Sequence, residues 1–314
     1  MQRIRLVVFL FAVVLATRAY SGNPPPTSAP VEMKLKWEVG KKYNLQITIT
    51  QVRWTFASRE PNRFDQTIES TRDFSVTAMR LRPEGGVELD MKLGELKLTI
   101  QKPSKILQFD TRQDPKTDGE DPTPAWLRKT IGMHLRFLTD TNGNVEKLVN
   151  LGEFMAQITN GAPEGMMSLA SLFNEDAIKG TWFMTQALPA KPVAIGESWP
   201  YHYETKSATT RPLVEDLRIT FKGWGYNAAR RFAVIEFNGE LIPKSGKEDP
   251  DETGKMKPGT VTGHIWLDVD TGTIVERETA HDLDYDIQTG GKTVTASLSQ
   301  RVRVKLIRVV DAEK

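Results

Sequence analysis

The sequence predicts a mainly β protein with a small α part. In this α+β fold, two diverged antiparallel β repeats form curved sheets or a half-barrel, with a helical block between them. Three observations predict it. Apolar and polar residues alternate along most of the chain, as in strands that bury one face. A tight-turn hairpin pattern occurs twice, at residues 136–147 and 265–277. The one substantial stretch of helical periodicity separates the two copies.

The first residues have the pattern of a secretory signal. Arg3 and Arg5 precede the apolar run Leu6–Ala16, and small residues precede Gly22. We expect cleavage and export to the periplasm or the exterior, with an uncleaved anchor as the alternative. No later run is long enough to span a membrane. The predicted segments are a signal peptide at 1–21, a proline-rich tether at 22–34, a first β repeat at 35–150, a helical connector at 151–185 and a second β repeat at 186–311.

Composition excludes several classes of site. The 314 residues contain no cysteine, which excludes disulfides, thiolate metal sites and a lipid-modified N-terminal cysteine. The formal net charge is +2, but Arg3, Arg5 and Arg18 lie in the predicted signal, so the mature chain carries about −1. Basic residues alternate with acidic and apolar ones rather than clustering. We therefore predict no nucleic-acid partner.

The first β repeat opens at Val39–Tyr43 and leads into a strand whose inward positions are Leu45, Ile47 and Ile49. Further strands are predicted at Phe74–Ala78 and after the turn at Pro83–Gly86. In the strand after this turn, the apolar set switches parity at Gly94–Glu95, which predicts a β-bulge. We expect Thr111–Pro124 to be a mobile excursion and Trp126–Ile131 to be a short helix.

The helical block begins where the apolar spacing changes from two residues to three and four. One helix is predicted from Leu151, and Pro163 marks the start of a second. Two interpretations remain open: amphipathic helices packed on a sheet, or a methionine-rich plug over an apolar cavity. The second interpretation gives a set of candidate ligand-binding residues: Phe154, Met155, Ile158, Met166, Met167, Leu169 and Phe173.

The second β repeat opens at Ile195–Trp199, which matches Val39–Tyr43 in having an apolar residue, a glycine, two polar residues and an aromatic residue. The two hairpins match when Gly143 is placed on Gly272. This alignment pairs Phe137 with Trp266, Leu138 with Leu267 and Thr139 with Asp268. Because the aspartates of the two turns do not coincide, we interpret the hairpin as an architectural corner.

The last two predicted strands flank Thr289–Gly291. A pairing in which residue numbers sum to 581 places Leu283 opposite Leu298. The same register pairs Glu278 with Arg303 on the other face. One register therefore satisfies both the apolar and the charged cross-strand pairs.

The sequence offers little chemistry. The four histidines are not at metal-ligand spacing, there is no nucleophile or phosphate-binding motif, and no catalytic residue or cofactor is predicted. Asp282, Asp284 and Asp286 share one strand face. Alternate strand positions lie roughly 6–7 Å apart, which makes them weak metal candidates. The competing interpretation is a solvated outer face.

The paired openings and the Leu267–Gly272 turn resemble a family of exported bacterial proteins known only as a domain of unknown function. The resemblance runs from Leu35 onward and implies no catalytic residue. More loosely, curved sheets with apolar helices resemble the half-barrel of periplasmic lipoprotein carriers.

Three functions stay open. The first is a non-catalytic protein that binds an apolar small molecule or lipid between sheet and helices. The second is an envelope structural protein or protein-interaction module without a small ligand. The third is a hydrolase with an unfamiliar site.

Overall fold

The computed structural model describes residues 29–57, 60–118, 120, 122–163, 187–205, 213–227, 230–243, 254–289 and 292–312. The helices are η1 (a 3-10 helix, Pro115–Thr117), α1 (Pro122–Lys129) and α2 (Leu151–Thr159). The strands are β1 (Lys41–Ala57), β2 (Glu60–Leu81), β3 (Val87–Lys102), β4 (Lys105–Asp110), β5 (His134–Thr139), β6 (Val145–Leu148), β7 (Ser198–Thr205), β8 (Leu213–Asn227), β9 (Arg230–Pro243), β10 (Gly254–Met256), β11 (Gly259–Asp268), β12 (Thr273–Thr289) and β13 (Lys292–Asp311).

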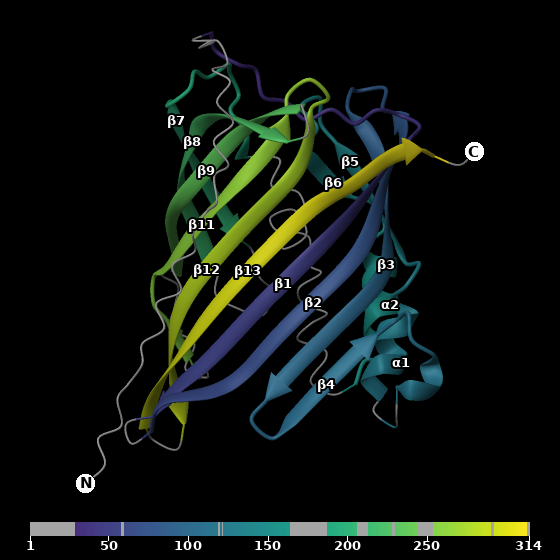
Figure 1. The fold of residues 1–314 in the computed structure, drawn as a ribbon. Helices are drawn as coiled ribbons and strands as arrows, with labels where there is room; N and C mark the ends of the chain where they lie inside the picture. The colour runs from purple at the N-terminus through teal and green to yellow at the C-terminus, as the bar shows by residue number, and fades with distance from the viewer. Residues whose placement is uncertain are drawn as a thin grey trace.

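These strands form one antiparallel sheet, which curves without closing into a barrel across the described residues (Figure 1). Its order is β6-β5-β3-β2-β1-β13-β12-β11-β9-β8-β7, with β10 beside β12 and β4 beside β3. The series β6-β5-β3-β2-β1 thus recurs in the same sense as β12-β11-β9-β8-β7, and β13 joins the two. The predicted mainly β, half-barrel-like class is confirmed. The segment boundaries stay predictions.

The two repeat openings have the same backbone geometry. Gly40 and Gly196 have φ angles of 83° and 87°, values that favour glycine. Each glycine precedes the first strand of its half, and each N–H donates to the neighbouring strand, Gly40 to the Ala78 carbonyl at 2.9 Å and Gly196 to the Phe221 carbonyl at 2.7 Å. The equivalence of β1 with β7 therefore rests on backbone bonding as well as on sequence.

The two hairpins also correspond, but their first strands are aligned differently from our prediction. Phe137 and Ile265 are both fully buried and both pair with a buried residue of the preceding long strand. Phe137 therefore matches Ile265, one residue before the predicted Trp266. The reason is that the second turn has five residues from its aspartate to its glycine and the first has four.

The corrected alignment gives the turn aspartates one role. The Asp140 carboxylate accepts the backbone N–H groups of Asn142 and Asn144, each at 2.8 Å. The Asp268 carboxylate accepts those of Asp270 and Thr271, each at 3.1 Å. Asp268 therefore corresponds to Asp140 and not to Thr139, since side chains that bond the backbone two residues onward stabilise such turns. The prediction that the aspartates do not coincide was wrong.

Two register predictions are confirmed. In β3 the buried set switches at Gly94, and the pairing with β2 shifts between Arg72 and Phe74. Between β12 and β13, Leu283 pairs with Leu298, and every pair from Glu276 to Thr289 follows the predicted sum of 581.

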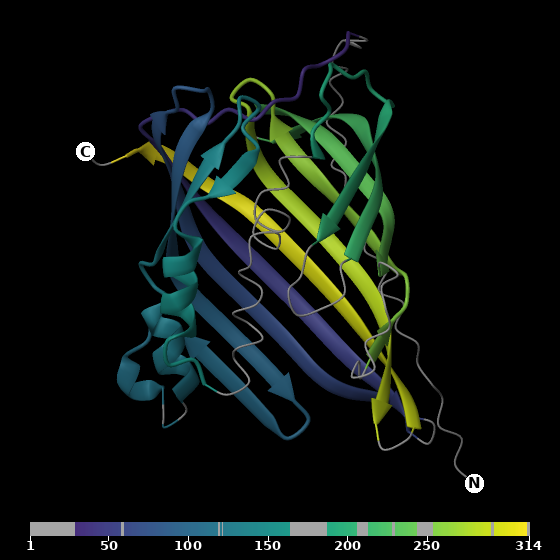
Figure 2. The ribbon, with the colours of Figure 1, turned by 180° about the vertical axis from the view of Figure 1, so that it is seen from behind.

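The helices occupy the flank of the first half, beside β3 and β5 (Figure 2). α2 forms from the predicted Leu151. α1 begins at Pro122, earlier than the predicted Trp126, because proline is compatible with the first turn of a helix. Arg128 of α1 bonds Asp118 at 2.6 and 2.8 Å, which ties the predicted excursion to the helix. Whether the excursion is mobile stays a prediction, and the second predicted helix lies outside the described residues.

Two apolar cores lie on the concave face of the sheet. The first joins β1, β2, β3, β5 and β13 to α1 and α2. The second joins β8, β9 and β11 to residues before β1 and before β7, including Met33 and Leu35. Met33 is 1% exposed, and Val31 pairs with Val193, so the last part of the predicted tether packs against the second half.

Candidate functional site

The middle of the concave face carries polar side chains. They occupy strand positions at which the alternation of side chains directs every second residue toward this face. Cross-strand pairing places Arg72 of β2, Ile47 of β1, Val304 of β13 and Arg277 of β12 in one row. Two adjacent rows add further polar groups. We name this set the polar stripe: Arg72, Gln51, Gln300, Arg277, Thr279 and His281.

One end of the polar stripe is a buried charged cluster. Arg277 is 6% exposed, and burial lowers its pKa to about 10 while the Glu215 carboxylate acts to raise it. His281 Nε2 lies 3.5 Å from Glu215 Oε1. Burial, and then Glu215, raises the pKa of the Tyr201 hydroxyl above its usual range. The Glu215 carboxylate therefore partly offsets the cost of burying the Arg277 charge.

The curvature of the second half makes this cluster possible. β11 and β9 separate β12 from β8, a span of about 14 Å along a flat sheet. The 3.5 Å contact between His281 and Glu215 requires the sheet to curl so that the two side chains meet. Gly263 of β11 permits close packing here, because a Cβ at that position would lie 2.4 Å from the Phe237 ring.

Thr279 Oγ1 and His281 Nδ1 of this cluster are buried polar atoms with no hydrogen-bond partner within the part of the chain that the structure describes. Thr279 is 1% exposed, so water does not readily replace a partner there. Buried polar atoms without a partner are uncommon in native proteins and call for a water, an ion or a ligand.

The other end of the polar stripe is Arg72, which is 8% exposed and pairs across the strands with Ile47 and Leu96. Its Nη2 donates to the Thr130 hydroxyl at 2.9 Å, whereas its Nη1 has no hydrogen-bond partner among the described residues. Burial alone lowers the pKa of Arg72 to about 10, so it stays charged at neutral pH. Thr130 follows the end of α1, whose dipole stabilises a nearby positive charge by about 1 kcal/mol at most. This is less than the several kcal/mol that an unpaired buried charge costs.

The predicted ligand-binding residues are partly placed. Phe154 and Ile158 are each 1% exposed and form part of the first core, and Trp126 Nε1 donates to the Ile158 carbonyl at 2.7 Å. Met155 is half-buried and packs against that core. The other four residues, Met166, Met167, Leu169 and Phe173, lie outside the described residues.

The three aspartates that we considered as weak metal candidates lie along β12 on the outer face. Asp284 accepts a hydrogen bond from Ser297, and Asp286 accepts one from Thr295 and pairs with Lys257 at 2.9 Å. The Lys257 ammonium, followed by the Thr295 hydroxyl, lowers the pKa of Asp286. No group of three or more metal-ligating side chains gathers in the described ranges.

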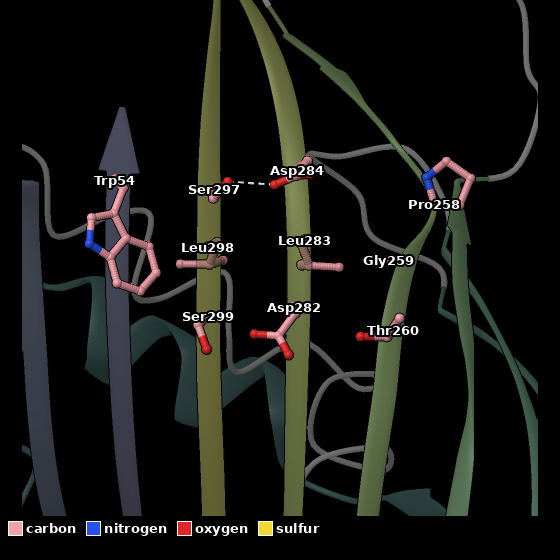
Figure 3. A pocket seen from close by; sticks show the side chains of 10 residues that line it. All are labelled: Trp54, Pro258, Gly259, Thr260, Asp282, Leu283, Asp284, Ser297, Leu298 and Ser299. Atoms are coloured by element: carbon pink, nitrogen blue, oxygen red, sulfur yellow. Dashed lines mark hydrogen bonds between the residues drawn. The ribbon is translucent and has the colours of Figure 1, made fainter. Parts of the chain in front are cut away.

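Asp282 and Asp284 line an open hollow of about 360 Å³ (Figure 3). Trp54 of β1 and Pro258 stand at its two sides, with Ser297 and Asp284 joined by a hydrogen bond between them. Its oxygen-rich floor could accept hydrogen bonds from a hydroxylated or cationic molecule.

Sequence reasoning missed the polar stripe. The sequence did contain a signal for it. Arg277 and Thr279 lie an even number of residues from Leu283 in the same strand, and Arg72 lies two residues from Phe74, so these polar residues occupy the same alternating positions as the apolar ones. Charged residues at inward positions of otherwise apolar strands indicate either buried pairs or binding groups. The proximity of Glu215 to His281 had no such signal, because it depends on sheet curvature.

In the described part of the chain, none of the helices is long and apolar enough to cross a membrane.

No curated protein matches the chain. Among solved structures, lipovitellin, in a study of its lipid–protein interactions, aligns with a TM-score of 0.48 and 9% identity, over 89% of this chain and 26% of that one. The chain thus spans about a quarter of the lipovitellin chain. A candidate lipoprotein from Parabacteroides distasonis aligns with a TM-score of 0.29 and 8% identity, over 90% of this chain and 100% of that one. A candidate exported protein with a YmcC-like fold from Bacteroides fragilis aligns with a TM-score of 0.23 and 9% identity, over 89% of this chain and 99% of that one.

A family model matches residues 84–274, which is more than half of the chain and includes both hairpin turns. The resemblance to a family of unknown function is thereby confirmed. The chain belongs to the family of unknown function DUF6263.

Proposed function

We propose that this protein is exported and holds an amphipathic, lipid-like ligand against the concave face of its sheet. The observation that carries the proposal is the arrangement of this face, in which the β12 part of the polar stripe lies between two apolar cores and Arg72 lies within the first core. The basic and apolar pattern ending at Ala16 supports export.

The apolar surface suits a hydrocarbon chain. Central strands β1 and β13 contribute Ile49, Leu45 and Leu306, which are only partly buried by the rest of the fold. Each methylene that leaves water contributes about 0.8 kcal/mol, close to a fourfold gain in affinity. We therefore expect affinity to rise about fourfold per added methylene in a series of alkyl ligands from eight to twelve carbons.

The polar stripe suits a headgroup. Thr279 Oγ1, His281 Nδ1 and Arg72 Nη1 are buried groups that a ligand could satisfy. A site for a purely apolar ligand needs no such polar groups, whereas a site for an amphipathic ligand needs them to bind the headgroup. Met155 and the four predicted residues beyond position 163 remain proposed contacts of the chain.

Native mass spectrometry of the full chain, followed by solvent extraction, tests the proposal. A co-purifying lipid-like mass and displacement of a fluorescent fatty acid are expected. Ile49→Gln should weaken fatty-acid binding at least tenfold, because it places an amide on the concave face. Thr50→Gln, on the adjacent residue but the opposite face, should leave it unchanged.

No ligand in native spectra and no binding of any alkyl ligand would overturn the proposal. If a stable protein partner were recovered in the absence of a small ligand, the interaction-module function would replace it.

A further inference from the structure

The polar stripe contains two buried arginines that differ in their partners. Arg72 and Arg277 stand in the same cross-strand row, separated by Ile47 and Val304, and are 8% and 6% exposed. The Glu215 carboxylate acts on Arg277. No ion pair joins Arg72 to any residue that the structure describes, and its one hydrogen bond is to the neutral hydroxyl of Thr130.

The cross-strand neighbours of Arg72 are apolar. They are Ile47 and Leu96, and Phe74 lies two residues along β2; these three side chains are 3%, 5% and 3% exposed. Water therefore cannot solvate the guanidinium as it would at the surface. The Nη1 donor has no partner among the described residues, and it marks the position where a hydrogen-bond acceptor belongs.

We propose that Arg72 binds the anionic group of the ligand, a carboxylate or a phosphate, through Nη1. The inference rests on the proposed function and gives its ligand a charge. The guanidinium is suited to this role because its planar donors match the oxygens of carboxylate and phosphate. Hydrogen bonds between charged partners are roughly twice as strong as neutral ones. The apolar row beyond Arg72 would carry the hydrocarbon chain.

The same chemistry could come from a free inorganic anion, so the ligands are chosen to separate the two sources. The full chain is titrated at pH 8 with dodecanoate, with dodecanol and with inorganic phosphate. Dodecanoate and dodecanol share one hydrocarbon chain and differ in charge, whereas phosphate has the charge without the chain. We expect dodecanoate to bind 10- to 100-fold more tightly than dodecanol.

Variants then test whether Arg72 is the residue that causes the preference for dodecanoate over dodecanol. Arg72→Met should reduce the preference for dodecanoate to about one while leaving dodecanol affinity unchanged. Arg72→Lys should keep part of the preference, since it retains the charge without the planar fork. Arg301→Met is the matched control, because Arg301 lies on β13 with a 66% exposed side chain and pairs with Glu278 on the outer face. Circular dichroism and thermal melts check that each variant folds.

The outcomes separate the two proposals. Equal affinity for dodecanoate and dodecanol, or an unchanged preference in Arg72→Met, would overturn the role of Arg72 and leave the lipid-like ligand standing. Phosphate stabilising the wild type but not Arg72→Met, with no alkyl ligand bound, would support the anion site and overturn the lipid-like ligand. Failure of all three ligands to bind would overturn both.

Discussion

The backbone N–H of Lys36 donates a 2.9 Å hydrogen bond to the carbonyl oxygen of Gly272. One residue later, Trp37 Nε1 donates to the carbonyl oxygen of Gly143 at 3.3 Å. The turn glycines of both repeated hairpins therefore bond one short segment, Leu35–Trp37. Leu35 belongs to the second core and Trp37 packs on the first. This segment therefore contacts both halves of the sheet.

Gly272→Ala should destabilise the protein by about 1–3 kcal/mol. The residue has φ +64°, and a Cβ there would lie 2.8 Å from the Lys36 nitrogen. Urea unfolding measures the change. Gly152→Ala is the control, because a Cβ at Gly152 in α2 meets nothing within 4 Å. The control should gain up to about 1 kcal/mol. Equal effects of the two substitutions would contradict the contact.

Trp37→Phe should cost about 1 kcal/mol of unfolding free energy, the net value of a typical hydrogen bond. Phenylalanine keeps an aromatic ring to pack edge-on against Tyr43, whose ring centroid lies 5.0 Å from that of Trp37, but it removes the donor to Gly143. Urea unfolding of this variant and of Gly143→Ala tests the common mechanism. If the hairpin contact is shared, the effects of the two changes will not add in the double variant.

Glu215→Gln should destabilise the fold by about 3–5 kcal/mol, because it removes the carboxylate charge that acts on the buried Arg277 and lies 3.5 Å from His281 Nε2. Adding Arg277→Met should recover part of the loss. The outer-face pair of Glu276 and Arg303, at 2.7 Å, is the control. Glu276→Gln should cost at most about 1 kcal/mol. A double-mutant cycle by urea unfolding measures both pairs, and equal losses would show that the inner pair is not buried in solution.

Asp118 should make the fold less stable in acid. The Arg128 guanidinium holds the pKa of the Asp118 carboxyl below its usual range. A carboxyl with a lowered folded pKa contributes stability that is fully present above its unfolded pKa of about 3.9 and is lost as the pH falls through the folded value. Urea midpoints of the wild type and Asp118→Asn should therefore differ at pH 6 and converge near pH 2. A difference that persists at pH 2 would contradict this pairing.

The sequence predicted those features that depend on neighbouring residues. The alternation that places Leu283 on one face of β12 and Glu278 on the other determined the β12–β13 register. The switch of the apolar set from odd to even positions at Gly94 located the β3 bulge. The first strands of the hairpins were misaligned by one residue because a turn glycine locates a turn but not its length. The meeting of His281 with Glu215 could not be predicted, since it depends on how far the sheet curls between β12 and β8.

The most direct test of the concave-face ligand is methyl NMR of the full chain with a spin-labelled fatty acid. The label should broaden the methyl signals of Ile49 and Val302, which pair across β1 and β13 on the concave face. It should spare Ile307 and Val310, which are 54% and 36% exposed at the end of β13. Broadening of Ile307 and Val310 with Ile49 and Val302 unaffected would contradict a ligand on the concave face.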